Sequence, residues 1–171
     1  MKAKSFNVKS IVLTGLFIAI GVILPRLLPL GSGMMLLPMH IPVLLCGLLC
    51  GIPYGIICGL VVPLISHFTV GMPQVPMLYA MLFELAAYGA VAGLVMKAPV
   101  KSYYGRVQIS LYVAMLLGRI VFGAVNALIF NIGDYSLNAW LTASFVTAAP
   151  GIVIQVVLIP PVVLAVNKIG R

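Results

Sequence analysis

The sequence predicts an all-α integral membrane protein in which residues 1–171 form a single transmembrane domain of six helices. Apolar residues make up 63% of the chain and charged residues only 7%, whereas an ordinary soluble domain has about 25% charged residues. The apolar residues also gather into runs of about the length that crosses a bilayer. These observations exclude a water-soluble globular protein, and the high hydrophobicity excludes a disordered chain.

Six apolar runs account for most of the chain. In order, their predicted bounds are 8–28, 37–51, 53–68, 76–96, 107–131 and 140–167. The second and third runs are short and meet at Gly51-Ile52-Pro53. Because proline lacks an amide donor and disfavours helical geometry at the residue before it, we expect a hairpin break there rather than one long bent helix.

The basic residues predict the orientation of these helices. Eight of the ten Lys and Arg residues lie at the chain ends or between the fourth and fifth runs: Lys2, Lys4, Lys9, Lys97, Lys101, Arg106, Lys168 and Arg171. With six helices these segments share one side, which the positive-inside rule assigns to the cytoplasm. The connections 29–36, 69–75 and 131–139 then face outward. The net charge of +8 thus indicates topology and contact with anionic lipid headgroups rather than nucleic-acid binding.

The sequence contains no motif of a metal, nucleotide or catalytic site. Cys46, Cys50 and Cys58 lie in apolar runs without histidine at ligand spacing, so we expect them to be packing thiols. No G-x-x-x-x-G-K-[ST], H-E-x-x-H or G-x-S-x-G pattern occurs, and the chain has only two carboxylates. We therefore expect no cofactor, no metal ion and no enzymatic activity.

Small residues recur every four positions in two places. The first run contains Gly15 and Ala19, and a longer stripe joins the second and third runs: Gly47, Gly51, Gly55 and Gly59. Such stripes allow helices to approach closely in lipid, which offers no hydrophobic drive for their association. Both internal packing and docking of another protein are possible, and we interpret the Gly15–Ala19 stripe as a docking surface.

Two charges lie deep within apolar runs. Glu84 is about eight residues from the outer end of the fourth run and Arg119 about eleven from that of the fifth, which corresponds to depths of about 12 and 16 Å. The two side chains can therefore meet. Because intramembrane charges are costly and face the bundle interior or a ligand route, they predict either a buried ion pair between two helices or contact with a polar solute.

Other polar side chains crowd the same outer half. Asn126 shares a helix face with Arg119, and Tyr88 shares one with Glu84. The rest of this set lies on or beside the second, third and sixth runs: His40, His67, Thr147 and Gln155. A mostly apolar cavity oriented by a few polar groups is typical of small-molecule sites. We predict a pocket for a small polar organic solute that opens outward.

Seven stretches carry a family resemblance: MHIPVLLCG (39–47), GIPYG (51–55), PLIS (63–66), GMP (71–73), MLFELAAYG (81–89), GRIVFG (118–123) and AAPGI (148–152). Together with Gln155 they resemble the substrate-binding (S) component of energy-coupling factor (ECF) transporters. The resemblance implies a vitamin-uptake subunit of the bacterial cell membrane, with six helices and cytoplasmic termini. It also implies a transmembrane coupling protein of the EcfT type and two cytosolic ATPases as partners.

The resemblance further assigns roles to particular segments. It implies that the loops 29–36 and 69–75, the latter with Gln74, help to shape the vitamin site. It implies that Gly15 and Ala19 contact the coupling protein, although the family usually has alanine at the first of these positions.

The predicted site residues are compatible with two kinds of vitamin. An anion such as pantothenate suits Arg119, whose planar guanidinium matches a carboxylate, unless Glu84 already neutralises it. A pyridoxine-like or pyrimidine compound would use Glu84, Asn126 and aromatic stacking. We favour pantothenate. Two other functions are kept as alternatives: a small membrane enzyme that acts on a lipid or isoprenoid through Glu84, and a helix-packing subunit without a ligand.

Overall fold

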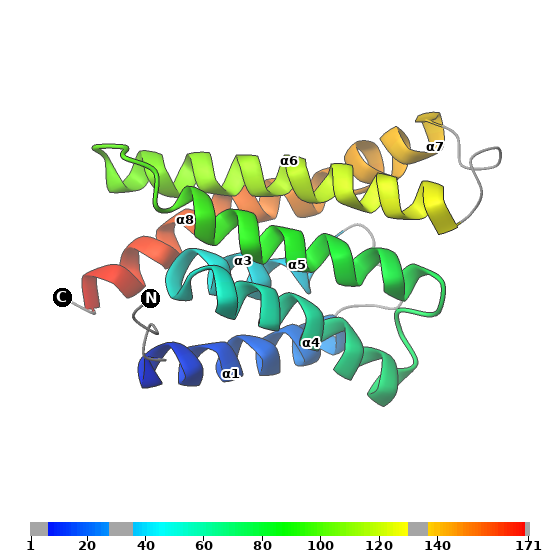
Figure 1. Ribbon diagram of the computed structural model, residues 1–171, viewed down its shortest axis with the longest axis horizontal. Coiled ribbons are helices and arrows are strands. Elements are labelled where there is room, and N and C mark those ends of the chain that lie inside the picture. The colour runs from blue at the N-terminus through cyan, green and yellow to red at the C-terminus, as the bar shows by residue number, and fades with distance from the viewer. Residues whose placement is uncertain (1–6, 28–35, 130–136, 170–171) are drawn as a thin grey trace, which may run out of the picture.

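The computed structural model describes residues 7–27, 36–129 and 137–169, and the elements in these ranges are all helical. In chain order (Figure 1) they are α1 (Val8–Ile23), the 3-10 turn η1 (Leu24–Leu27), α3 (His40–Cys50), α4 (Ile52–Val70), α5 (Met77–Val95), α6 (Tyr103–Ile129), α7 (Leu137–Leu141), the π-helical turn η2 (Thr142–Thr147) and α8 (Ala149–Ile169). The predicted all-α class is confirmed. Most of the predicted connections 29–36 and 131–139 lies outside the described residues.

Five helical segments are long and apolar enough to cross a membrane: Val8–Leu27, Ile52–Val70, Met77–Val95, Tyr103–Leu128 and Ala149–Lys168. The chain is therefore a multi-pass membrane protein. The second predicted span is the short helix α3, whose 11 residues rise only about 16 Å, roughly half of a bilayer core. Eight of those residues are buried, because α3 packs against α1, α4, α5 and α8.

The break between the second and third runs is confirmed. Gly51 ends α3 with a φ of 93°, a backbone conformation that favours glycine, and its amide donates to the Gly47 carbonyl. Pro53 then lies in the first turn of α4, where a missing amide donor costs no helical hydrogen bond.

Two predicted helix bounds are wrong. The fifth helix begins at Tyr103 rather than at residue 107, so Arg106 belongs to its first turn, where the guanidinium donates to the Val100 carbonyl. The sixth run is not one helix, because α7, η2 and α8 divide it. Pro150 explains the final break, since it cannot donate an amide hydrogen bond to a preceding turn but is tolerated at the start of α8.

Glycines bring α3 and α4 into direct backbone contact with α5. A Cβ atom added to Gly55 or to Gly47 would lie 2.5 Å from the Gly89 carbonyl oxygen, and one added to Gly59 would overlap the Leu85 backbone. We call Gly47, Gly55, Gly59 and Gly89 the glycine seam. Three of the four glycines in the predicted stripe are thus used for internal packing, whereas a Cβ atom added to Gly51 would meet no described residue within 4 Å.

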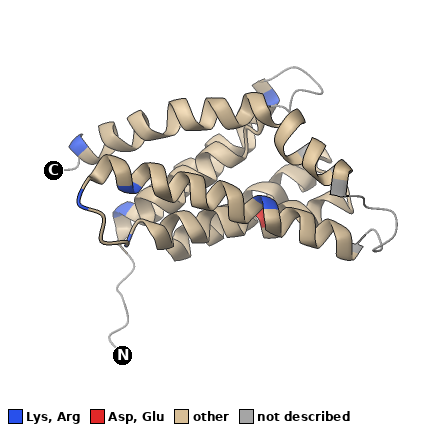
Figure 2. Cartoon of the chain, turned by 90° about the horizontal axis from the view of Figure 1, so that it is seen from above, with Lys and Arg blue, Asp and Glu red and all other residues tan. Residues whose placement is uncertain are grey.

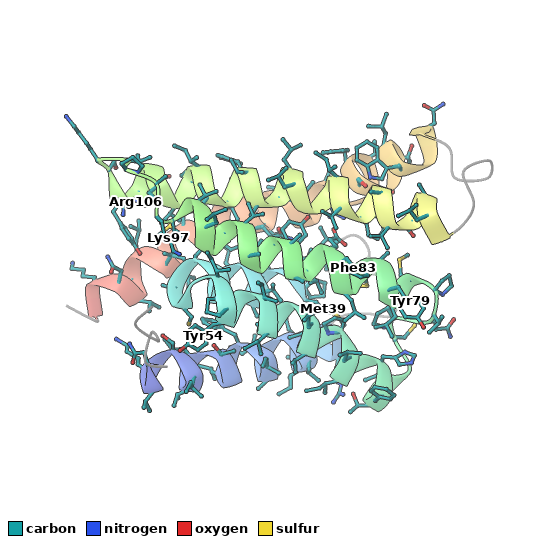
Figure 3. The ribbon with its side chains drawn as sticks, in the orientation of Figure 1. Met39, Tyr54, Tyr79, Phe83, Lys97 and Arg106 are labelled. Carbon is teal, nitrogen blue, oxygen red and sulfur yellow. The ribbon has the colours of Figure 1, made fainter. Side chains whose placement is uncertain are left out.

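Cationic residues gather at one end of the bundle. The start of α1, the end of α8 and the connection from α5 to α6 share this end, where most of the Lys and Arg segments lie (Figures 1 and 2). Lys97, Arg106 and Tyr54 lie near it, whereas Tyr79 and Phe83 lie towards the opposite end (Figure 3). The bundle therefore has one basic end and one end with few charges among the described residues.

Candidate functional site

A buried ion pair joins α5 to α6 in the interior of the bundle. Arg119 Nη1 lies 3.0 Å from Glu84 Oε1, and the two residues are only 5% and 1% exposed. Glu84 is the one acidic residue in the described ranges, and Figure 2 shows it beside a basic residue midway along the bundle. The prediction that these two charges meet is confirmed.

Two aromatic side chains complete a cluster around Glu84. His40, the first residue of α3, places Nε2 3.4 Å from Glu84 Oε1, and its ring packs edge-on against Tyr88 with 5.1 Å between ring centroids. Tyr88 follows Glu84 by one helical turn, so both project from the same face of α5. His40 and Tyr88 are 3% and 1% exposed. We call Glu84, Arg119, His40 and Tyr88 the buried cluster.

Several polar atoms in and near this cluster lack a hydrogen-bond partner among the described residues. They are Nε and Nη2 of Arg119, both ring nitrogens of His40 and both amide atoms of Gln155 on α8. Gln155 is 1% exposed. Because buried polar groups in proteins are nearly always hydrogen-bonded, a concentration of unpartnered donors and acceptors is typical of a place where a polar molecule binds.

A cavity of about 180 Å³ adjoins Arg119 between α6 and α8 and is open on one side, where Tyr112 and Leu116 are exposed. Among the described residues that line it, Arg119 is the charged one, and the others are large and mostly apolar: Tyr112, Met115, Leu116, Phe145, Ile152 and Val156. Tyr112, Leu116 and Arg119 share one face of α6 because they are four and three residues apart. The helical periodicity could have identified Tyr112 and Leu116 as neighbours of Arg119, but the sequence does not show which face of α8 packs against them.

The remaining predicted site residues have their contacts elsewhere. Asn126 is buried, yet its side-chain amide donates to the Phe122 carbonyl of its own helix. His67 Nδ1 lies 2.8 Å from the carbonyl oxygen of Pro73, and Gln74 is exposed. Thr147 is half-buried at the end of η2. The structure therefore assembles four of the nine predicted solute-binding residues, with Gln155 as a fifth buried candidate on α8.

Trp140 attaches α7 to α6, a role that sequence analysis did not predict. Its indole Nε1 donates a hydrogen bond to the Arg119 carbonyl oxygen, 3.1 Å away. The ring lies against Gly123, where an added Cβ would overlap it. The hydrogen bond from Trp140 thus anchors the α6 backbone at Arg119 from the end of the bundle opposite to the basic end.

Gly15 and Ala19 differ from the glycine seam because both are exposed. A Cβ atom added to Gly15 would meet nothing within 4 Å. Their neighbours Val12 and Leu16 are exposed as well, so this face of α1 is an apolar surface that the described part of the chain does not cover.

Comparison with known protein families gives a match over most of the chain. The family model described as "ECF transporter, substrate-specific component" matches residues 9–163, which is nearly the whole chain. Comparison with curated proteins gives no match. The family consists of transporter components rather than enzymes, and the resemblance found in the sequence is confirmed.

Proposed function

We propose that this chain, which belongs to the family of ECF transporter substrate-specific components, captures a small water-soluble vitamin at the outer side of a bacterial cell membrane. A separate transmembrane coupling protein and two cytosolic ATPases would then drive its uptake. The buried cluster carries this proposal, because it presents unpartnered polar atoms beside a largely apolar cavity. That combination orients and encloses small organic ligands.

The charge distribution supports the orientation in this proposal. The basic end contains Lys9, Lys97, Lys101, Arg106 and Lys168, and the positive-inside rule assigns such an end to the cytoplasm. Arg119 is 16 residues from the start of α6 and 10 from its end, or about 24 and 15 Å. The buried cluster would therefore lie in the outer half of the membrane, with α3 as the second of six crossings.

Pantothenate is our first candidate for the solute. Its single carboxylate suits Arg119, and its hydroxyl and amide groups can use Gln155 and His40. The Glu84–Arg119 pair reduces the net positive charge of the site, which favours a neutral heterocycle of the pyridoxine or pyrimidine kind as the second candidate. Such a ring would pack against His40 and Tyr88. Mass spectrometry of small molecules retained on the gently purified protein tests both candidates directly.

The exposed face of α1 supports contact with the coupling protein. Gly15 and Ala19 lie one helical turn apart and leave a flat strip among larger apolar residues. In lipid, a strip of small residues lets a second helix approach to van der Waals contact. We place the docking site of the coupling protein there.

Replacing Gly15 by leucine separates capture from uptake. We expect Gly15→Leu to abolish vitamin uptake by cells that express the whole transporter, because the leucine side chain prevents close approach of the coupling protein. Solute binding to the isolated chain should stay within threefold of wild type, since no described residue packs within 4 Å of the new Cβ atom. Uptake assays in cells and binding to the purified protein measure the two effects.

Ala124→Leu provides the matched control for this experiment. Ala124 is exposed on α6, so the substitution adds similar bulk to a different surface and should change neither uptake nor binding. Loss of binding in Gly15→Leu would contradict the docking role of α1. A folded wild-type chain that retains and binds no small molecule would contradict capture and favour a helix-packing subunit.

A further inference from the structure

The ion pair occupies only one part of the Arg119 guanidinium. Glu84 contacts Nη1, whereas Nε and Nη2 have no hydrogen-bond partner in the described ranges. In a planar guanidinium, the Nε–H and one Nη2–H bond point in the same direction and form a fork. The atoms that Glu84 leaves unpartnered are thus the two that can hold both oxygens of a carboxylate at once.

The surroundings of Arg119 make this fork a strong site for an anion. The residue is 95% buried, so water does not compete freely for its donors. Hydrogen bonds from a charged, buried guanidinium to a carboxylate are stronger than those between neutral groups, and the bidentate form adds geometric specificity. Leaving such donors without an acceptor is costly.

The few charges of the cluster disfavour a ligand with more than one negative charge. Arg119 contributes one positive charge and Glu84 one negative charge. The other cations in the part of the chain that the structure describes lie towards the bundle ends: Lys9, Arg26, Lys97, Lys101, Arg106 and Lys168. A doubly charged phosphate would therefore bring more negative charge into the interior than the cluster can balance.

The cavity beside Arg119 suits the uncharged part of such a ligand. Its volume of about 180 Å³ is about six times the share of liquid volume that one water molecule occupies. Leu116, Ile152 and Val156 line it with apolar side chains. An apolar body would match this lining.

Building on the proposed function, we infer that the solute is a monocarboxylic acid with a compact apolar body. Its carboxylate binds Nε and Nη2 of Arg119 while Glu84 holds Nη1, and its body fills the cavity between α6 and α8. The inference concerns a water-soluble acid that enters from outside, not a fatty acid drawn from the membrane.

Matched pairs of acids and neutral analogues test this inference on the full chain in lipid nanodiscs. Suitable pairs are pantothenate and pantothenol, nicotinate and nicotinamide, biotin and its amide, and lipoate and lipoamide. Isothermal titration calorimetry should show that one acid binds and that its neutral partner binds at least 100-fold more weakly. Equal affinity within such a pair would overturn the inference while the proposed function stands.

Two variants locate the contacts. Arg119→Lys keeps the positive charge but removes the fork, so it should weaken binding of the acid at least 30-fold and leave the neutral analogue within threefold. Leu116→Trp fills the cavity and should weaken binding of both at least tenfold. Leu117→Trp is its control, because Leu117 is also exposed on α6 but does not line the cavity. Thermal unfolding verifies that each variant is folded.

The remaining outcomes separate the inference from the proposed function. Octanoate that binds as tightly as the preferred acid would identify a fatty-acid site and overturn the inference. A neutral vitamin found by mass spectrometry, with no acid bound, would overturn the inference and support the proposed function. A folded chain that binds neither acids nor neutral compounds would overturn both.

Discussion

The α4–α5 contact and the α6–α8 contact differ in how they pack. Between α4 and α5, the glycine seam brings backbones into contact and leaves no space for a side chain. Between α6 and α8 lies a cavity of about 180 Å³ that is open on one side, because Tyr112 and Leu116 in its lining are exposed. Glu84 and Tyr88 project from the helix that the seam holds in place, whereas Arg119 lies at the edge of the cavity. The α4–α5 contact can position the cluster while the α6–α8 contact leaves room for a ligand.

The largest expected effect comes from breaking the glycine seam. Gly89→Leu would force a side chain into the backbone of Gly55, and we expect it to lower the free energy of unfolding by more than about 4 kcal/mol. The yield of monodisperse protein and its thermal unfolding measure this effect. Gly15→Leu is the control within the same chain, because it adds the same atoms in open space and should leave thermal stability unchanged. A Gly89→Leu protein as stable as wild type would show that the seam can separate without cost.

Removing the ion pair between Glu84 and Arg119 should have the second-largest effect, which is on solute binding. Arg119→Ala should weaken solute binding by about 2 kcal/mol or more, because it leaves buried polar groups unpaired, and it should also destabilise the protein by isolating the Glu84 charge. The double variant Arg119→Met with Glu84→Gln removes both charges, so stability should recover. Calorimetry should still detect no tight binding. Wild-type affinity in the double variant would mean that the pair only holds α5 against α6.

Asn126 should give the smallest effect. Asn126→Ala removes a buried amide two helical turns beyond Arg119 on the same face of α6, and we expect a loss of about 1 kcal/mol in solute affinity without unfolding. Asn138→Ala, which removes an exposed amide on α7, is the matched control and should bind normally. Because the Asn126 amide donates within its own helix, a fall in stability with unchanged affinity would assign it to packing.

Much of the fold was predictable because apolar runs and prolines act locally. The five long helices follow from the runs, and the break before Pro53 follows from the chemistry of proline. The division of the sixth run was not predicted. Residues 142–147 are apolar enough to continue a helix, so composition does not show that they form a π-helical turn before Pro150.

The candidate site was predictable to the extent that depth in the membrane brings groups together. Similar depths predicted that Glu84 and Arg119 could meet, and one helical turn placed Tyr88 beside Glu84. The partner of each small-residue stripe was not predictable from spacing. Gly15–Ala19 and Gly55–Gly59 have the same four-residue period, yet one stripe is exposed and the other is in contact with α5. The cavity likewise depends on how α6 and α8 are rotated against each other.

Backbone contact at the seam also constrains how such proteins diverge. Even alanine at position 55 or 89 would collide with the backbone of the opposite helix, so a family that changes its cargo has little freedom to redesign this pair of helices. Variation that alters selectivity can accumulate around Leu116, Ile152 and Val156, where neighbours are side chains rather than main chain. We expect related proteins with other nutrients to keep the glycines and to differ at these three positions.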